Sequence, residues 1–483
     1  MQRSKRIKCL AVSAALLWAF AGFAQTDTVE VRIYGGQRDD RGLRLIEMAN
    51  GDVVALSSSN STTDEEPHAW VRRFNEEVNV VWDATVADAP LLQAQDVVEH
   101  GSGLLTILGT RYANASAAYD WGWYTVDANG VQTAESHWGT ESWDLPSRVL
   151  HRNDSLWTLG TSYANGTGDL HCTLHTWTAG AWALASQWSV ETAGEASVVD
   201  AEWFGSRLAV FAAMDGDDHA AFSVLDPLTG EADWTFATSF GVPTTAQAFS
   251  VQDSTAALLI NAATDDGVRL GFVCLTLEGD TLLETIPGSG VNIEGRDIAW
   301  YGPENFATIA VTEELGLGGQ EWLYSRWTSG GVWQGGPTFG SQWDEVPSAI
   351  LHAADGRLWM LGATDGYSNG RDDAYLLVAP SPGVGNNETY FNEEVNIIEN
   401  AVSIGDPIDP SSVTVFPNPA RNEFTLSGVG NATKWNLVDA LGRTVVSGQG
   451  AGGDASGLPG GTYWLVLESA PSPAVLTLQV ATR

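Results

Sequence analysis

Lysine is almost absent from this chain. It occurs at Lys5, Lys8 and Lys434 among 483 residues, and 23 Lys and Arg side chains face 60 Asp and Glu, which gives a formal net charge of −37. Nucleic acids and anionic membrane surfaces are bound by clustered basic side chains that displace counterions, so this charge argues against both as partners. A negatively charged, self-repelling surface accounts for the imbalance. A role in cation binding is the alternative.

Cysteine is also scarce, with three residues in the chain. Cys9 lies in the N-terminal apolar segment. Cys172 and Cys274 fall at corresponding positions of two repeats that are not adjacent, too far apart for the Cα separation of ~6 Å that a disulfide needs. The sequence therefore predicts two buried, unpaired thiols.

No apolar run in the sequence is long enough to span a bilayer. The apolar stretch from Cys9 to Phe23 follows a basic start and is shorter than the ~20 residues of a membrane-spanning helix. Small residues at Gly22 and Ala24 suit a signal peptidase. We therefore expect residues 1–24 to be a signal peptide that is cleaved before Gln25. The mature protein is then secreted or held on the outer cell surface, without a transmembrane segment.

Glycine, tryptophan and a repeated apolar strand are abundant. With 52 Gly, 21 Trp and 44% hydrophobic residues, the chain has enough apolar material for a large core. A short apolar segment returns at intervals of 52, 51, 52, 49, 50 and 51 residues, with its anchor at Leu56, Leu108, Leu159, Phe211, Ile260, Ala310 and Leu361. A period near fifty residues is typical of propeller blades. We predict an all-β chain with a seven-bladed β-propeller over residues 25–380, whose repeats resemble those of large secreted bacterial propeller proteins.

The ring of such a propeller must be closed by a strand from outside the repeats. Each repeat reads as four strands separated by turn residues, but the last one lacks an obvious fourth strand. The segment Val29 to Tyr34 precedes the first repeat, so we predict that it completes the last blade. Phe391 to Ile398 is a competing segment, because its sequence nearly copies that of Phe74 to Val81.

Three ordered motifs mark the C-terminal part of the chain. They are VFPNPA from Val415, LVDALGR from Leu437 and LPGGTYWLVL from Leu458. With these motifs, residues 411–483 resemble a type A sorting domain of the type IX secretion system of Bacteroidota. The resemblance implies contact with the type IX secretion machinery, passage across the outer membrane, removal of the domain, and surface attachment or release.

The residues of this C-terminal part also have the pattern of a small fold of their own. Alternating strands broken by Asn-Pro and Gly-Gly turns predict a small C-terminal β-sandwich. An ordinary binding sandwich is the alternative to a sorting domain. Residues 381–410, which are rich in Pro, Gly and Asn, are predicted to be a linker.

Acidic residues recur at one position of the repeat. They stand fifteen or sixteen residues before the anchor, where an inner strand begins at one mouth of the central channel, and they are Asp40, Asp144, Glu195, Glu294 and Glu345. Calcium takes about six to eight oxygen ligands, which converging carboxylates could provide. These five residues are therefore the candidate metal ligands, and calcium is the candidate cofactor. Acidic residues are also common at turns and strand starts, which is the simpler explanation.

Other patterns that suggest chemistry have structural explanations. His171 and His175 lie ~13 Å apart along one strand, too far to share a metal ion. Gly366 to Gly370 matches a nucleophile elbow, but it joins two strands, whereas an elbow joins a strand to a helix. The repeat itself explains three histidines at the first hairpin turn of their blades, namely His100, His151 and His352.

Three functions stay open at this point. The first is a non-enzymatic secreted or surface propeller whose mouth binds a glycan, a protein or a cation. The second is a polysaccharide hydrolase or lyase that uses channel-mouth carboxylates. A glycosidase would need two carboxyl groups roughly 5 to 9 Å apart, one of them with a raised pKa. The third is a purely structural surface-layer component.

Overall fold

The computed structural model describes residues 29–481 with gaps at 37, 62–66, 87–91, 102, 113–117, 193, 215–218, 289, 316–317, 342, 367–370, 381, 383–388, 392–395, 399–412, 428–433, 439–442 and 468–473. The predicted signal peptide and most of the predicted linker lie outside the described residues. In the described part, the regular secondary structure is β-strand throughout, so the all-β prediction is confirmed. The same part of the chain contains no helix that could span a membrane.

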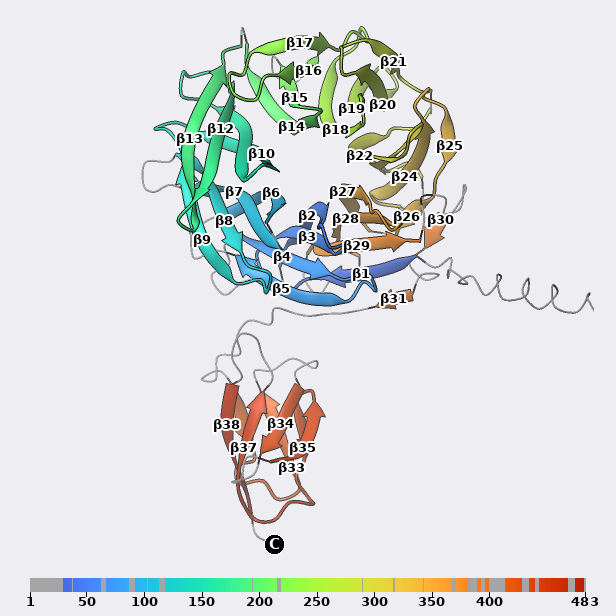
Figure 1. Ribbon diagram of the computed structural model, residues 1–483. Coiled ribbons are helices and arrows are strands. Elements are labelled where there is room, and N and C mark those ends of the chain that lie inside the picture. The colour runs from blue at the N-terminus through green and yellow to red at the C-terminus, as the bar shows by residue number, and fades with distance from the viewer. Residues whose placement is uncertain are drawn as a thin grey trace, which may run out of the picture.

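Antiparallel sheets follow one another in chain order around a central channel, in a propeller-like ring (Figure 1). We number them from the N-terminus. Sheet 1 contains β2 (Asp40–Glu47), β3 (Val53–Ser59), β4 (His68–Phe74) and β5 (Val80–Val86). Sheet 2 contains β6 (Leu92–His100), β7 (Leu104–Tyr112), β8 (Tyr119–Val126) and β9 (Gln132–Trp138). Sheet 3 contains β10 (Asp144–Arg152), β11 (Ser155–Ser162), β12 (Asp169–Thr178) and β13 (Ala181–Val190).

Sheets 4 and 5 repeat this four-strand plan, and sheet 6 contains two further strands. Sheet 4 contains β14 (Ala196–Phe204), β15 (Arg207–Met214), β16 (His219–Leu225) and β17 (Ala232–Ala237). Sheet 5 contains β18 (Thr244–Gln252), β19 (Thr255–Thr264), β20 (Gly267–Thr276) and β21 (Thr281–Thr285). Sheet 6 contains β22 (Glu294–Gly302), β23 (Asn305–Thr312), β24 (Glu321–Thr328), β25 (Trp333–Gly335), β26 (Thr338–Gly340) and β30 (Thr389–Phe391).

Sheet 7 joins the two ends of the ring-forming sequence. It contains β27 (Glu345–His352), β28 (Leu358–Thr364), β29 (Asp373–Ala379), β1 (Glu30–Tyr34) and β31 (Asn396–Ile398), in that order. β1 pairs antiparallel with β29, which confirms the prediction that the N-terminal segment supplies the missing strand. The competing segment joins as well, because β31 pairs parallel with β1 on its other side.

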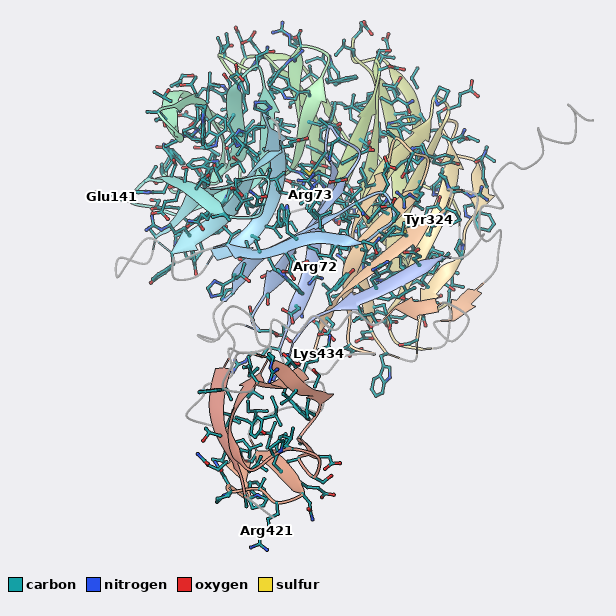
Figure 2. All side chains as sticks on the ribbon, turned by 60° about the horizontal axis from the view of Figure 1, so that its bottom comes forward. Arg72, Arg73, Glu141, Tyr324, Arg421 and Lys434 are labelled. Atoms are coloured by element: carbon teal, nitrogen blue, oxygen red, sulfur yellow. The ribbon has the colours of Figure 1, made fainter. Side chains whose placement is uncertain are left out.

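The closing strand β1 also contacts sheet 1. Arg72 of β4, labelled in Figure 2, places its guanidinium carbon 3.7 Å from the ring centroid of Tyr34 in β1. The ring of Tyr34 lies 5.9 Å from that of Phe74. Such cation–π and aromatic contacts add to the burial of apolar surface. β1 therefore contacts both sheet 7 and sheet 1, the two sheets that meet at the closure.

The hydrophobic core lies between neighbouring sheets. Between sheets 1 and 2, for example, Leu56 and Val71 pack against Ile107 and Tyr124, all at most 2% exposed. Cys172 and Cys274 are buried and unpaired in β12 and β20, which confirms the prediction for both thiols. Each sheet thus covers the faces of its neighbours, and the inner strands are held at fixed positions around the channel.

Every inner strand is interrupted at the same level of the channel. The pairing register with the second strand shifts by one residue next to Arg44, Asp96, Arg148, Asp200, Ala248, Asp297 and Ala349. Such a bulge re-aims the side chain beside it. Charged residues therefore recur at one level of the channel.

Three of these carboxylates join adjacent sheets. Asp96 accepts a hydrogen bond from Val149 N at 2.9 Å. In the same way, Asp200 accepts from Phe249 N at 3.0 Å, and Asp297 accepts from Ile350 N at 2.9 Å. The bulge level is thus fixed by hydrogen bonds that cross from one sheet to the next.

The C-terminal residues form two further sheets. One contains β32 (Thr414–Phe416), β33 (Glu423–Ser427) and β36 (Gly452–Asp454), and the other contains β35 (Thr444–Gln449), β34 (Lys434–Val438), β37 (Gly461–Leu467) and β38 (Ala474–Val480). Phe424 of the first sheet and Leu437, Tyr463 and Leu465 of the second belong to one buried cluster. The described C-terminal strands therefore have a core of their own.

Candidate functional site

Three of the predicted metal ligands are fully buried and accept hydrogen bonds from nearby loops. Asp40 accepts from Gly36 N and Ser61 Oγ, both at 2.7 Å. Asp144 accepts from Thr140 N at 2.5 Å and from Ser162 Oγ at 2.6 Å. These carboxylates hold the loop before the inner strand against the end of the second strand.

Glu345 repeats this arrangement in sheet 7. It accepts hydrogen bonds from Ser341 N at 2.9 Å, Ser341 Oγ at 2.6 Å and Thr364 Oγ1 at 3.1 Å. Its pKa is raised to about 7, mainly because burial disfavours the charged form, with a further contribution from the charge of Glu321. Burial likewise raises the pKa of Asp40. These carboxyl groups therefore act first as structural acceptors.

The other two predicted ligands lie at the surface with different partners. Glu195 accepts a hydrogen bond from Tyr163 Oη at 2.9 Å. Glu294, whose side chain is 43% exposed, pairs with Arg296 at 2.9 Å. Among the described residues, no three His, Cys, Asp or Glu side chains come together in a way that could hold a metal ion. Calcium thus stays a prediction from the sequence.

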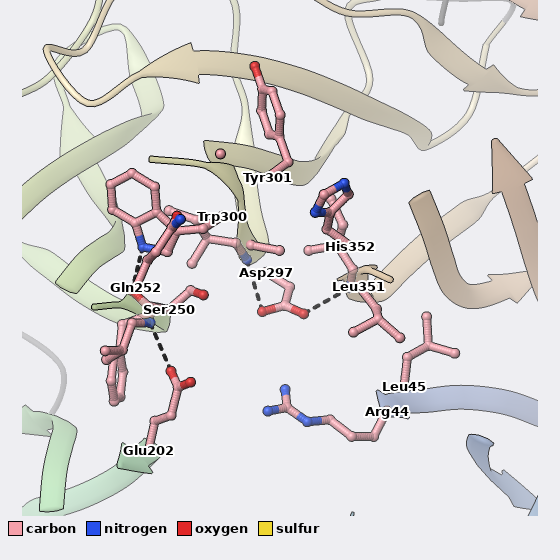
Figure 3. A pocket seen from close by; sticks show the side chains of 16 residues that line it. Arg44, Leu45, Glu202, Ser250, Gln252, Asp297, Trp300, Tyr301, Leu351 and His352 are labelled. Atoms are coloured by element: carbon pink, nitrogen blue, oxygen red, sulfur yellow. Dashed lines mark hydrogen bonds between the residues drawn. The ribbon is translucent and has the colours of Figure 1, made fainter. Parts of the chain in front are cut away.

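A cavity of about 520 Å³ opens at the opposite end of the channel, where inner strands end. Gln252 and His352 are the last residues of β18 and β27, whereas Asp40 and Glu345 are the first residues of β2 and β27. Figure 3 shows the polar and aromatic side chains that line the cavity, among them Arg44, Glu202, Gln252, Asp297, Trp300, Tyr301 and His352. They come from the inner strands β2, β14, β18, β22 and β27, which the bulges and the bonds between sheets hold in place.

Glu202 is a carboxyl group of the cavity with a strongly raised pKa. Its Oε2 atom accepts a hydrogen bond from Val251 N at 2.9 Å (Figure 3). Burial, together with repulsion from Asp200, raises its pKa to about 8, although Val251 N–H and the guanidinium groups of Arg44 and Arg148 oppose the shift. At neutral pH this carboxyl is therefore mostly protonated, so it can both donate and accept a hydrogen bond.

Asp297 and Arg44 form the floor of the cavity. Asp297 accepts hydrogen bonds from Ile298 N and Ile350 N, each at 2.9 Å, one to each carboxylate oxygen (Figure 3). Burial raises its pKa. Arg44 Nε lies 3.4 Å from Asp96 Oδ1, so its charge is partly compensated. The two groups also line a second cavity of about 280 Å³ at the bulge level, together with Arg148 and Arg296.

Two aromatic side chains and a histidine complete the wall. The rings of Tyr301 and His352 meet edge-on with centroids 6.2 Å apart. Tyr301 Oη donates to Gln334 Oε1 at 3.0 Å, and Trp300 Nε1 donates to Ser250 O at 2.9 Å. Burial lowers the pKa of His352. Its neutral ring can therefore exchange hydrogen bonds with a bound molecule.

Sequence reasoning singled out His352 but assigned it to the repeat, and it did not find Glu202 or Arg44. Both residues carry charge inside an inner strand, but other inner strands carry charged residues as well, so this signal does not single them out. The elbow-like segment Gly366 to Gly370 lies largely outside the described residues. His171 and His175 pack against Trp138 and Trp123, with ring centroids 4.4 Å apart in each case, which agrees with a packing role.

Comparison with known proteins gives similarity in fold alone. No protein-family model matches the chain, and no curated protein matches its sequence. A solved PL25 ulvan lyase is similar with a TM-score of 0.48 and 12% identity, over 72% of this chain and 96% of that one. The polysaccharide lyase Uly1 is similar with a TM-score of 0.42 and 10% identity, over 71% of this chain and 90% of that one. A subtype N10 neuraminidase-like protein of A/little yellow-shouldered bat has a TM-score of 0.41 and 9% identity, over 64% of this chain and 97% of that one. These scores are too low to indicate a function.

Proposed function

We propose that this protein is a secreted or cell-surface seven-bladed β-propeller that binds an uncharged saccharide in the cavity at the ends of its inner strands. The cavity carries the proposal: its volume of about 520 Å³ falls within the range of small-molecule sites. Its wall combines the rings of Trp300 and Tyr301 with the hydrogen-bonding groups of Glu202, Gln252 and His352. Sugars present both apolar C–H faces and hydroxyl groups to such a wall.

The charge state of the cavity supports an uncharged ligand. Glu202 holds its proton at neutral pH because its pKa is about 8. Both carboxylate oxygens of Asp297 already accept backbone hydrogen bonds. Arg44 lies next to Asp96. A hydroxyl-rich neutral molecule therefore gains hydrogen bonds there without having to leave a charge uncompensated.

Export by the type IX secretion system is part of this proposal. The three C-terminal motifs supply strands β32, β34 and β37, and residues of β34 and β37 share one core cluster. A small β-sandwich that serves as a sorting domain fits this arrangement, and so does a cleaved N-terminal signal peptide. Expression of the chain without residues 411–483 in a type IX-competent bacterium tests this: the truncated protein is expected in the periplasm and the full chain outside the cell. Equal export of both would contradict it.

Saccharide binding is tested with the chain from Gln25 to Arg483 on an array of neutral and acidic oligosaccharides, followed by calorimetric titration of the best ligand. We expect neutral ligands to bind and Glu202→Leu to weaken binding at least about tenfold. Glu99→Leu is the matched control, because Glu99 accepts a similar bond from Ala49 N in the adjacent sheet at 2.6 Å but does not line the cavity. The absence of any neutral ligand, or equal affinity of the Glu202→Leu variant, would refute the proposal.

A polysaccharide-cleaving enzyme is the second candidate function. Its support is the protonated Glu202, which could serve as a general acid in the same cavity as His352 and Tyr301. Incubation with neutral and acidic polysaccharides, with detection of new reducing ends and of unsaturated products, tests for cleavage. A Glu202→Gln variant that binds but does not cleave would favour the enzyme. If no cleaved product is detected, the enzyme hypothesis is refuted and only the binding function is retained.

A further inference from the structure

Three aromatic side chains form a ledge at the other end of the channel. Tyr112 ends β7 and Tyr119 begins β8, directly opposite each other in the strand pairing. Their ring centroids lie 5.6 Å apart at 67°. Trp143, in the loop before β10, meets Tyr119 edge-on with centroids 5.7 Å apart at 78°. We call Tyr112, Tyr119 and Trp143 the aromatic ledge.

The ledge is held in place by hydrogen bonds around Trp143, its most exposed residue. Trp143 is 54% exposed. Its carbonyl accepts a hydrogen bond from Tyr163 N at 2.9 Å. The next residue, Asp144, is buried and accepts a hydrogen bond from Thr140 N in the same loop at 2.5 Å. The indole is thus presented to solvent from a fixed backbone, which lowers the entropy cost of binding.

The ledge and the cavity lie at opposite ends of the channel. Trp143 immediately precedes the first residue of its inner strand, whereas Gln252 and His352 of the cavity are the last residues of theirs. A ligand on the ledge therefore does not touch the cavity, and the two sites can be tested apart.

We propose that the aromatic ledge is a second binding site, which holds a neutral polysaccharide chain by stacking of its sugar rings. Rigid Tyr and Trp side chains offer wide contact area at little conformational cost, and exposed aromatic groups of this kind mark binding surfaces. The sign of charge selects the class of polymer. Glu141, two residues before Trp143, is exposed at the outer surface of the ring (Figure 2), and Glu195 is exposed near Tyr163. An anionic polymer would be repelled by these side chains and by the net charge of −37.

The chain contains a natural comparison for this site. Trp343 lies in a similar segment before sheet 7, with one more residue between it and the inner strand, and is 50% exposed. The residue that corresponds to Tyr119 is Gln320 there, so Trp343 lacks the neighbouring tyrosine ring. The effect of removing an exposed indole can therefore be distinguished from the effect of removing the aromatic ledge.

The test is affinity electrophoresis of the full chain in gels that contain a mixed-linkage β-glucan, a galactomannan or a xylan, with alginate as the acidic polymer. We expect retardation in at least one neutral polymer, no retardation in alginate, and at least about tenfold weaker retardation for Trp143→Ala and Tyr119→Ala. Trp343→Ala and the control variant Glu99→Leu, which lies outside both sites, should migrate like the unchanged protein. Thermal unfolding of each variant confirms that the fold is retained. No retardation in any neutral polymer, or equal effects of Trp143→Ala and Trp343→Ala, would overturn the proposal.

Discussion

Arg148 Nε lies 2.6 Å from Asp200 Oδ1, across the boundary between sheets 3 and 4. The same guanidinium reaches Asp96 of sheet 2 at 3.6 Å, and its side chain is 9% exposed. Burial opposes the charge of Arg148, but Asp200 and Asp96 outweigh it and raise its pKa. One cation thus connects three consecutive sheets at the bulge level of the channel.

Removal of this cation is expected to be costly. Arg148→Ala leaves Asp200 buried without its ion-pair partner and Asp96 with Arg44 alone, which should lower the free energy of unfolding by ~3–5 kcal/mol. Arg357→Ala is the control, because Arg357 pairs with Asp355 two residues away near the surface and its loss should cost at most ~1 kcal/mol. Urea unfolding followed by tryptophan fluorescence measures both. Similar losses of stability for the two variants would show that the buried ion pairs of Arg148 contribute no more than the ion pair of Arg357.

Acid should destabilise sheets 2 and 3. Burial lowers the pKa of His100, His171 and His175 to about 4 each. A folded-state pKa below the unfolded value of about 6.5 gives stability that is complete above pH 6.5 and is lost as the pH falls towards 4.

The variant His175→Phe keeps a ring against Trp123 but cannot take up a proton. Its free energy of unfolding should therefore fall less steeply between pH 6.5 and 4 than that of the unchanged protein. His137→Phe, at an exposed position, is the matched control and should keep the original slope. If both variants have that slope, the buried imidazole is not the source of the acid sensitivity.

Protonation of Glu345 should stabilise the fold, in contrast to protonation of the buried histidines. Its raised pKa of about 7 means that the folded state binds this proton more tightly than the unfolded state. Stability is then greatest below the unfolded pKa of about 4.5 and declines as the pH rises through 7. Glu345→Gln removes this titration, so its stability should change less between pH 5 and 8. Thermal denaturation at several pH values measures it, and parallel curves for the two proteins would contradict the assignment.

Closure of the ring by β1 can be tested with a variant of a buried residue in this strand. Val31 is fully buried and packs in one cluster with Trp322 and Leu377. Val31→Ala should reduce the free energy of unfolding by about 2 kcal/mol through lost burial and a cavity. Val332→Ala, at a side chain that is 63% exposed, should have an effect within ~0.5 kcal/mol. A neutral Val31→Ala variant would mean that β1 is not part of the stable ring.

The apolar repeat was enough to predict the strands, because burial on both faces leaves a strong signal. Leu56 and Phe211, for example, are fully buried in second strands of their sheets, as their spacing predicts. The N-terminal closing strand was also predictable, since Val29 to Tyr34 is an apolar strand with no repeat of its own. The pairing of β31 with the outer edge of β1 could not be predicted. The sequence shows that two segments compete for the last blade, but it does not show that both can join the sheet.

The functional residues were harder to find, for a physical reason. The direction of a side chain on an inner strand depends on the bulge, and Glu202 and Arg44 come after one. Four of the five acidic residues begin an inner strand and Glu195 directly precedes one. The buried ones accept hydrogen bonds from hydroxyl groups such as those of Ser61, Ser162 and Thr364, at or just beyond the ends of second strands. A carboxylate that faces a serine in the next loop and one that faces a metal ion have the same sequence pattern.

The pairing of Glu30 with Val378 has a consequence for the order of assembly. β1, the first described strand, finds its neighbour only after the intervening polypeptide has emerged from the ribosome. A nascent chain therefore cannot close the ring of sheets until β29 has been synthesised.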